Sequence, residues 1–346
     1  MALNKANAIP ADSLKKHKVG VLPSAFYTPE TRLGFGSLVY TYLKIGNDSL
    51  TKKSNTQSYL SYTINKQFAF ENDYQIWLAK NKYYFTGSFD YSRFPQYYYG
   101  IGNSTKQSDK IMFRYDLLKI QTKSLIKIAG IIYGGVSFQY QNVFNQDIEL
   151  MSNSMCAEIY GSKGFVSKGI GPIIIVDKRD NPLNPAKGFY VEASYLDYKN
   201  LLVNKHMFSS LLIDLRKFNT LFGKLISNSS FFLNTNDGMV PYRLMAEIGG
   251  ARFLRGYYRG RFRDNNMFAL QQEFRMPVYK MFGLAVFGGI GNVASKPKLL
   301  LSNEIHYDFG IGLRIRVNKK ENANLRIDYG ITKDSQGLYV VFAEAF

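Results

Sequence analysis

The sequence predicts an all-β fold, a transmembrane β-barrel of about sixteen antiparallel strands. Long stretches of the chain alternate apolar and polar residues with a period of two, as strands with one apolar face do. The chain has 26 Tyr, 26 Phe and 29 Gly, a composition typical of barrels with aromatic rings at both bilayer interfaces. Apolar runs such as residues 173–176 are far shorter than the roughly 20 residues of a membrane helix. Composition alone leaves a soluble all-β protein as the commoner alternative.

Residues 305–317 show the alternation most clearly. The polar face carries charge at His306, Asp308, Arg314 and Arg316. The apolar face consists of Ile305, Tyr307, Phe309, Ile311, Leu313, Ile315 and Val317. The run exceeds the five or six residues usual in soluble strands and reaches the roughly 9–11 residues of a tilted membrane strand. Because a charged face cannot form the core of a sandwich, we expect it to line a wet lumen.

The same alternation recurs along the chain, in residues 126–140, 211–216, 268–276 and 325–331, although Gln272 interrupts one apolar face. Clusters of turn-forming residues such as 181–185 and 334–337 separate these runs. The predicted strands are residues 17–27, 33–45, 56–65, 67–79, 82–93, 109–121, 124–141, 163–177, 188–198, 205–218, 223–235, 267–277, 283–292, 304–317, 323–331 and 337–346. An even number of strands is usual for bacterial membrane barrels.

Three predicted connections are long, residues 94–108, 142–162 and 236–266, and we expect them on one rim with tight turns on the other. The domain organisation is one barrel over residues 17–346, preceded by a segment, residues 1–16, too short to fold alone. The first residues have no apolar core of the kind that a secretory signal needs. Because the rest of the sequence indicates an exported barrel, we expect that the numbering describes a mature chain whose leader has been replaced. The single cysteine, Cys156, says nothing about redox compartment.

The formal net charge of the chain is +18 at pH 7. Nucleic-acid binding is the first function that such a charge suggests. The basic residues, however, are scattered along predicted strands and turns rather than gathered on one helix or arm. A barrel beside lipopolysaccharide phosphates, or one with a basic lumen, would carry the same charge. We therefore expect outer-membrane lipid and lipopolysaccharide as partners, and no nucleic acid.

The most informative stretch lies in the longest predicted loop. Two glycines precede a short motif there, in the order Gly249, Gly250, Leu254, Arg255, Gly256, Tyr257. This arrangement resembles the lumen-returning loop of the BamA/TamA superfamily of outer-membrane barrels, whose signature is an apolar residue followed by Arg-Gly-Phe or Arg-Gly-Tyr. The resemblance implies that the loop folds into the lumen and that Arg255 pairs there with Glu273, where the family has an acidic residue on its twelfth strand. The alternative is a solvated arginine among the other arginines of the loop.

A second landmark looks like the family's turn between the eighth and ninth strands. Its members are Asp177, Asp180, Asn181, Pro182, Pro185 and Gly188. The two prolines stiffen a tight turn, and the glycine permits re-entry into strand geometry. Residues 18–24 and 97–102 also look similar to bacterial members of the group, so the resemblance extends from about residue 17 to the end. It implies a location in the outer membrane of a Gram-negative bacterium.

Two departures from the family pattern matter. The family usually has an aspartate on the thirteenth strand that contacts the loop arginine, but the matching position here is Gly289. One expected anchor for Arg255 is therefore missing. The superfamily also has periplasmic POTRA domains before the barrel, whereas residues 1–16 alone precede the first predicted strand. This implies a barrel-only member that works with a separate periplasmic protein subunit.

The last predicted strand resembles the β-signal that barrel assembly machinery recognises. It begins at Gly337 and ends at Phe346, with Phe342 four residues earlier. Glu344 falls on the same face as Phe346 and departs from the apolar pattern. We expect it near the bilayer edge, where an acidic residue on the lipid face costs roughly 0–1 kcal/mol.

Catalysis has little support in the sequence. His306 and Asp308 share one strand face, about 7 Å apart along the strand, and no serine partner is identifiable, so a polar pair lining the lumen is the simpler interpretation. One cysteine and three dispersed histidines offer no metal-ligand spacing. The glycines near 288–289 and 310–312 lie within predicted strands, so they do not indicate a phosphate-binding loop. We expect no catalytic residue, metal or cofactor.

Three function classes remain. The resemblance implies a non-enzymatic insertase or translocase for outer-membrane or secreted proteins, or for lipids, that opens a lateral seam between residues 17–27 and 337–346. A weakly paired edge there could accept an incoming strand, so we expect fewer backbone hydrogen bonds across this seam than between any other neighbouring strands. The alternatives are a passive pore or transporter with a charged lumen, and a lipid hydrolase or acyltransferase. A loop 236–266 that fills the lumen would argue against the pore.

Overall fold

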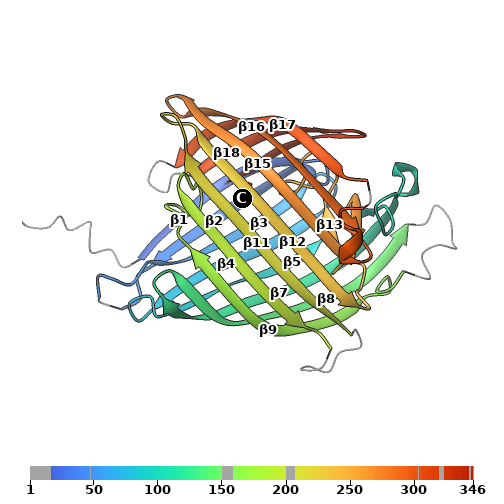
Figure 1. Ribbon diagram of the computed structural model, residues 1–346, viewed down its shortest axis with the longest axis horizontal. Helices are drawn as coiled ribbons and strands as arrows, with labels where there is room; N and C mark the ends of the chain where they lie inside the picture. Colours follow the sequence, from blue (N-terminus) through green and yellow to red (C-terminus); the bar gives the residue numbers. More distant parts are fainter. Residues whose placement is uncertain are drawn as a thin grey trace, which may run out of the picture.

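The computed structural model describes residues 17–46, 48–149, 159–199, 207–302, 304–318, 323–342 and 344–345. One antiparallel sheet contains seventeen strands, and sixteen of them close into a barrel (Figure 1). The ring consists of β1(His17–Thr28), β2(Arg32–Leu43), β3(Ser54–Thr63), β4(Phe68–Leu78), β5(Tyr83–Arg93), β7(Ile111–Ala129), β8(Ile132–Glu149), β9(Phe165–Asp177), β10(Gly188–Asp197), β11(Phe208–Thr220), β12(Ile226–Gly238), β15(Asn266–Tyr279), β16(Phe282–Ala294), β17(His306–Asn318), β18(Ala323–Thr332) and β19(Gln336–Phe342).

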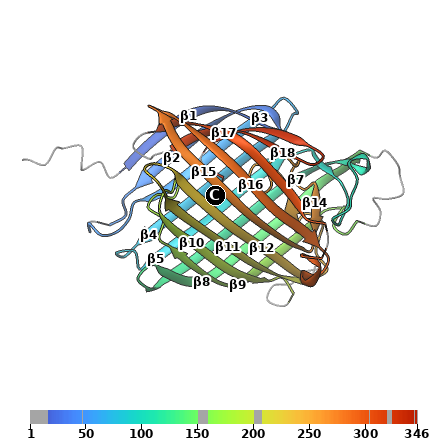
Figure 2. The same ribbon diagram turned by 45° about the horizontal axis from the view of Figure 1, so that its top comes forward.

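The remaining elements are short and lie outside the ring. β6(Gln96–Tyr98) pairs with β7, and β13(Ala246–Ile248) pairs with β14(Phe262–Asp264) inside the long connection between β12 and β15. Two 3-10 turns, Gln107–Asp109 and Pro297–Leu299, complete the described structure. Among the described residues, no helix is long and apolar enough to cross a membrane. The strands slant across the barrel in both ribbon views (Figure 2).

The predicted all-β barrel and its strand number are confirmed, but one predicted turn is wrong. The prediction placed a boundary near residues 122–123, whereas β7 continues to Ala129 and turns at Gly130 and Ile131. Gly130 has a φ of 50°, a conformation that glycine adopts without strain. Lys123, one of the two polar residues mistaken for a turn, faces the lumen instead and pairs there with Glu192 at 2.7 Å. The alternation over residues 126–140 therefore belongs to two strands.

The alternation predicted for residues 305–317 separates the two faces of the barrel wall. Tyr307, Phe309 and Ile311 are 46%, 52% and 65% exposed on the outside, while Asp308 and Arg314 on the inner face are buried. Gln272, the polar interruption on an outer face, bonds across to β12 through the hydroxyls of Ser229 (2.5 Å) and Ser227 (2.9 Å). Its amide is therefore paired within the wall, as a polar group facing lipid needs to be.

The two rims of the barrel differ in their connections. The end of the barrel at which β1 begins is here called the terminal rim, and the opposite end the loop rim. The described connections of the terminal rim are residues 44–46, 48–53, 79–82, 130–131, 178–187, 221–225 and 280–281. The long connections between β5 and β7, β8 and β9, and β12 and β15 all belong to the loop rim, as predicted. The second is shorter than predicted, because β8 continues to Glu149 rather than ending at residue 141.

The ring closes through a sparsely paired seam between its first and last strands. β1 and β19 share one register pair, Tyr27 with Val340. β1 pairs with β2 over 12 residues, and β18 pairs with β19 from Leu325–Phe342 to Ile331–Gln336. Among the described strands of the ring, this seam has the fewest paired positions, as expected from the sequence.

Candidate functional site: a loop anchored in the lumen

The connection between β12 and β15 folds into the barrel rather than outward. Gly249 and Gly250 begin the turn with φ angles of 110° and 87°. Their amides bond to the carbonyl oxygens of Phe253 (3.1 Å) and Tyr257 (2.9 Å), which closes residues 249–257 into a compact turn. A Cβ on Gly249 would overlap the carbonyl oxygen of Tyr258, so glycine is required there. The predicted entry of this loop into the lumen is confirmed.

Arg255 is the central side chain of this loop and is 1% exposed. Its Nη1 donates to Glu273 Oε2 on β15 and to Asp328 Oδ2 on β18, each at 2.8 Å. The guanidinium lies over the ring of Phe287 on β16, with Cζ 3.3 Å from the ring centroid. The structure thus brings together the predicted pair, Arg255 and Glu273, and adds a second carboxylate from β18.

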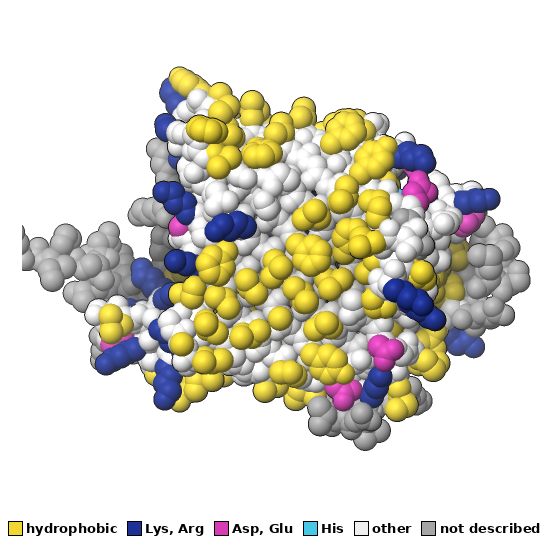
Figure 3. Space-filling view, in the orientation of Figure 1, with side chains coloured by type: hydrophobic (Ala, Val, Ile, Leu, Met, Phe, Trp, Pro, Cys, Tyr) yellow, Lys and Arg dark blue, Asp and Glu magenta, His cyan; other side chains and the backbone are white. Residues whose placement is uncertain are grey.

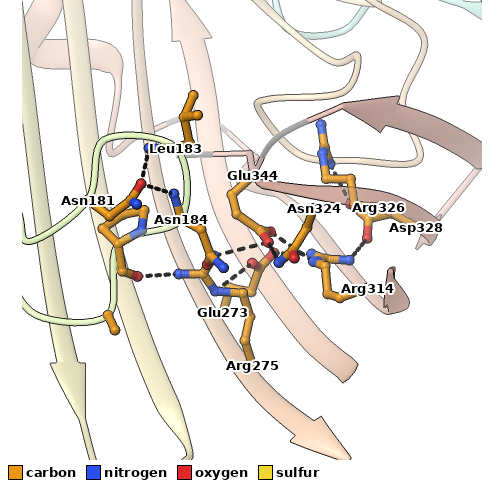
Figure 4. Close-up of polar contacts among 12 residues, drawn as sticks. Asn181, Leu183, Asn184, Glu273, Arg275, Arg314, Asn324, Arg326, Asp328 and Glu344 are labelled. Carbon is orange, nitrogen blue, oxygen red and sulfur yellow. Dashed lines mark hydrogen bonds and ion pairs between the residues drawn. The ribbon is translucent and has the colours of Figure 1, made fainter. Parts of the chain in front are cut away.

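The two carboxylates belong to a larger buried cluster of charges (Figure 4). Arg314 on β17 contacts three carboxylates, Asp328 (2.6 Å), Glu344 (2.8 Å) and Glu273 (3.3 Å). Arg326 also bonds Asp328 and donates to the carbonyl oxygen of Ala251 in the loop at 2.8 Å. Every side chain of the cluster is at most 4% exposed; its members are Arg255, Glu273, Arg275, Arg314, Arg326, Asp328 and Glu344. Buried charges of this kind fix geometry more surely than they stabilise the fold.

The turn between the eighth and ninth strands of the ring, β9 and β10, reaches the same cluster. Asn181 Oδ1 accepts the amides of Leu183 (2.7 Å) and Asn184 (3.0 Å), which shapes the turn. Arg275 then donates to Asn184 Oδ1 (2.8 Å) and to the carbonyl oxygen of Pro185 (2.6 Å), while its Nη1 lies 3.2 Å from Glu344. Figure 4 shows Arg275 between this turn and Glu344. The lumen loop and the terminal rim are therefore joined through one network of ion pairs and hydrogen bonds.

The other residues predicted for this turn have local roles. Asp180 Oδ1 accepts the amides of Asn181, Ala186 and Lys187 at 2.9–3.2 Å. Asp177 pairs with Arg179 at 2.8 Å. Gly188 has a φ of 104°, and a Cβ there would overlap the carbonyl oxygen of Lys178. Pro182 is exposed, whereas Pro185 is buried beneath the turn. The turn is thus a rigid support that holds Asn184 and Pro185 toward the lumen.

Backbone contact between the loop and the last strands is unusually close. Gly256 has a φ of 116°, and its amide donates to the hydroxyl of Tyr339 on β19 at 3.0 Å. The same hydroxyl donates to the carbonyl oxygen of Tyr257 at 3.1 Å. A Cβ on Gly330 of β18 would overlap the carbonyl oxygen of Arg255. Both glycines are needed because two backbones meet here without space for a side chain.

Apolar packing completes the anchor. Leu254 is fully buried with a φ of 49°, and its amide donates to Gln271 Oε1 at 3.2 Å. Tyr257 packs edge-on against Phe262 and against the imidazole of His306. His306 stacks on Phe262 with centroids 3.7 Å apart. His306 therefore lines the lumen as predicted and is a packing partner of the loop.

The loop also contacts the opposite side of the ring. Arg252 pairs with Asp214 on β11 at 2.8 Å. The amide of Arg259 donates to Glu30 Oε1, in the turn between β1 and β2, at 2.6 Å, and its carbonyl oxygen accepts from Gln96 at 3.1 Å. These contacts come from strands on several sides of the barrel, so the loop crosses the lumen.

Two loop groups have pKa values displaced by this environment. Burial raises the pKa of Glu247 on β13, but the nearby charges of Arg259, Arg263 and Arg243 outweigh it and lower the pKa to about 2. For Arg255 the directions are reversed: burial lowers the pKa of the guanidinium, but the nearby charges of Glu273 and Asp328 outweigh burial and raise it. Both groups are therefore charged in the lumen at neutral pH.

Two expectations from the sequence are corrected here. Gly289 does lie on the thirteenth strand, where a Cβ would be 2.8 Å from Asp308 Oδ1. Arg255 nevertheless has a second anchor, because Asp328 on the fifteenth strand takes that role. Glu344 was expected on the lipid face, yet it points into the lumen and is held by Arg314 and Arg275. Arginine on two inner strand faces supplies the charge that draws it inward.

The remaining predicted residues belong to the end of the chain. Gly337 pairs with Gly330 across β18 and β19, beside the close backbone contact. The side chain of Phe342 and all of Phe346 lie outside the described residues, so the proposed β-signal stays a prediction. Among the described residues, no group of three or more His, Cys, Asp or Glu side chains is arranged to hold a metal ion.

Sequence reasoning missed Asp328, Arg314, Arg275 and Tyr339 as members of the site. Three of them were visible as charged residues on the polar faces of alternating strands. Their meeting depends on how far β15, β17 and β18 are staggered around the barrel, which no local pattern specifies. Tyr339 carried no signal, since a tyrosine near a strand end is ordinary in a membrane barrel.

Comparison with known proteins supports the fold. No protein-family model and no curated protein sequence matches this chain. Among solved structures, BamA from Haemophilus ducreyi lacking POTRA domains 1–3 is similar over 95% of this chain and 70% of its own, with a TM-score of 0.64 and 12% identity. CdiB from Acinetobacter baumannii is similar over 94% of this chain, with a TM-score of 0.58 and 13% identity. CdiB from Escherichia coli is similar over 93% of this chain, with a TM-score of 0.61 and 9% identity. The chain spans 60% and 62% of those two structures.

Proposed function

We propose that this chain is an outer-membrane barrel of a Gram-negative bacterium that helps other proteins insert into or cross the membrane, without catalysing a covalent reaction. The observation that carries the proposal is the seam, where β1 and β19 share one register pair. Inter-strand hydrogen bonds contribute about 0.5–1.5 kcal/mol each in water, and an unpaired backbone group in lipid costs several kcal/mol. Opening the ring between other strands would break many backbone hydrogen bonds. Opening it at the seam would break few and would expose a strand edge with which an incoming strand can pair.

The lumen contacts suggest which side of the seam moves. β19 is held to the loop by Tyr339, and Glu344 beyond it is held by Arg314 and Arg275. β1 has no comparable side-chain anchor among the described residues; its nearest link to the loop is Glu30, in the turn that follows it. We infer that β1 separates from β19 while β15–β19 stay fixed around the loop. An incoming strand would then pair first with β1.

Photocrosslinking tests this asymmetry. A photoreactive amino acid at Val21, which is 61% exposed on β1, should capture an unfolded outer-membrane polypeptide during its insertion. The same amino acid at Leu215 on β11, an outward residue that is 38% exposed and far from the seam, is the matched control. Equal capture at both positions would contradict entry through the seam.

A passive pore is the alternative, and the loop opposes it. Residues 239–265 contact β11, β15, β18, β19 and the turn after β1, so they cross the lumen. Planar-bilayer recordings should show low conductance for the native protein and higher conductance after deletion of residues 251–257. Large, stable native conductance would favour the pore.

The activity itself is tested by reconstitution. Liposomes containing the purified barrel are mixed with a urea-unfolded outer-membrane barrel, and folding of that client is followed by its heat-modifiable gel mobility. We expect faster folding than in empty liposomes. The separate periplasmic subunit stays a prediction, and a gentle detergent pull-down followed by mass spectrometry tests it.

A further inference from the structure

The terminal rim is strongly basic. Its turns and adjacent strand ends carry ten exposed lysines: Lys52, Lys53, Lys80, Lys82, Lys127, Lys178, Lys187, Lys217, Lys224 and Lys280. The described acidic residues there are few and already bonded. Asp48 accepts from Thr51, Asp177 pairs with Arg179, and Asp180 accepts three backbone amides of its own turn. The rim therefore presents excess positive charge to its surroundings.

The loop rim differs, because acidic residues lie among its basic ones and pair with several of them. Arg114 pairs with Asp147 (3.5 Å), Lys199 with Asp237 (3.1 Å) and Lys333 with Glu304 (3.1 Å). No ion pair of any of the ten terminal-rim lysines occurs within the described part of the chain. Figure 3 shows this asymmetry on one face: Lys and Arg line the left end with little acidic colour beside them, whereas the right end mixes both.

The lysines of the terminal rim lie beside exposed apolar side chains. Lys224 follows Phe222, which is 91% exposed in the turn between β11 and β12. Lys280 lies between Tyr279 and Met281, 62% and 43% exposed, with its Nζ 5.0 Å from the tyrosine ring centroid. Lysines that extend from an apolar base toward water are suited to the boundary between acyl chains and headgroups.

The distribution of the lysines around the ring indicates which kind of partner the positive charge contacts. They come from the turns after β2, β4, β9, β11 and β15 and from the ends of β7 and β11, so they extend around most of the barrel rather than marking one sector. A protein partner would cover one sector, whereas a leaflet meets the whole circumference. We infer that the terminal rim binds the phosphate headgroups of anionic glycerophospholipids in the leaflet where it lies. This inference rests on the proposed membrane location, but not on the proposed insertase activity.

Lipid selectivity can be measured on the full chain without any client. The folded protein is placed in phosphatidylcholine bilayers containing trace spin-labelled phosphatidylglycerol or spin-labelled phosphatidylcholine. Electron spin resonance then gives the relative association of each lipid with the protein. We expect about a fivefold preference for phosphatidylglycerol, the ratio that corresponds to roughly 1 kcal/mol per basic side chain at an anionic surface. Raising salt from about 10 mM to about 1 M should remove most of it, since the screening length falls from about 30 to about 3 Å.

Two matched variants locate the effect. The terminal-rim variant replaces five exposed lysines by glutamine, K80Q, K82Q, K217Q, K224Q and K280Q, and the loop-rim control replaces five others, K66Q, K106Q, K110Q, K296Q and K298Q. The preference should fall clearly in the first, which keeps five of the ten lysines, and stay unchanged in the second. Heat-modifiable gel mobility checks that both variants are folded. A native preference near one, a preference insensitive to salt, or equal loss in both variants would overturn the inference. The salt titration needs no variant, so a folding failure leaves it decisive.

Discussion

Replacing Arg255 by alanine should release the lumen loop while leaving the barrel closed. Arg255 makes two charge-assisted hydrogen bonds of 2.8 Å, to Glu273 and Asp328, and each such bond contributes about 1.5–3 kcal/mol. Breaking a buried ion pair costs about 3–5 kcal/mol when the remaining charge is left alone. Here both carboxylates keep a cation, because Arg314 lies 3.3 Å from Glu273 and 2.6 Å from Asp328. We therefore expect the lower end, about 3 kcal/mol.

Hydrogen exchange of the loop amides in detergent measures this loss. About 3 kcal/mol corresponds to roughly 100-fold faster exchange through local opening, most directly at Gly256, whose amide bonds to Tyr339. Arg252→Ala is the control on the same loop. Its side chain is 44% exposed, and its partner Asp214 keeps Arg216 at 2.5 Å, so the expected cost is about 0–1 kcal/mol. Equal exchange rates in the two variants would refute the assignment of Arg255 as the anchor.

Further predictions concern the same loop. Glu273→Ala should also loosen it, and the double variant with Arg255→Ala should cost less than the sum of the single changes, whereas strict additivity would show that the two residues do not communicate. Gly330→Ala should raise proteolysis within residues 249–259, because its Cβ overlaps the Arg255 carbonyl oxygen, while the outward-facing Gly288→Ala should not. The lowered pKa of Glu247, about 2 against 4.5 when free, predicts loop protection that is complete above about pH 4.5 and lost as pH falls toward 2. Glu247→Gln should abolish that pH dependence, and a dependence that persists would assign it to another group.

The wall of the barrel follows from local sequence patterns, and the site follows only in part. Period-two alternation is a property of each strand by itself, so residues 305–317 could be assigned an inner and an outer face before any partner was known. The boundary near residues 122–123 was wrong because a lumen-facing Lys123 resembles a polar turn residue. In a wet barrel, both environments are polar, and the pattern does not separate them.

The pairing of Arg255 with Glu273 came from the resemblance, whereas Asp328 required the three-dimensional ring. Asp328 lies 73 residues from Arg255, and they meet because the loop crosses to β18. Glu344 shows the same limit. Its position predicts a lipid-facing charge, but the arginines of β15 and β17 draw it into the lumen. Register between distant strands, rather than residue type, decides both contacts.

A disulfide across the seam tests the account most directly. Tyr27 and Val340 are the paired positions of β1 and β19, and Tyr27→Cys with Val340→Cys would join the strands there. Client folding in barrel-containing liposomes is then compared between the oxidised and reduced forms of this variant, with Phe231→Cys and Leu270→Cys, a pair on the well-paired β12 and β15, as the control. We predict that oxidation abolishes assistance only at the seam, that reductant restores it, and that the barrel stays folded throughout. Undiminished client folding with the seam locked would contradict lateral opening.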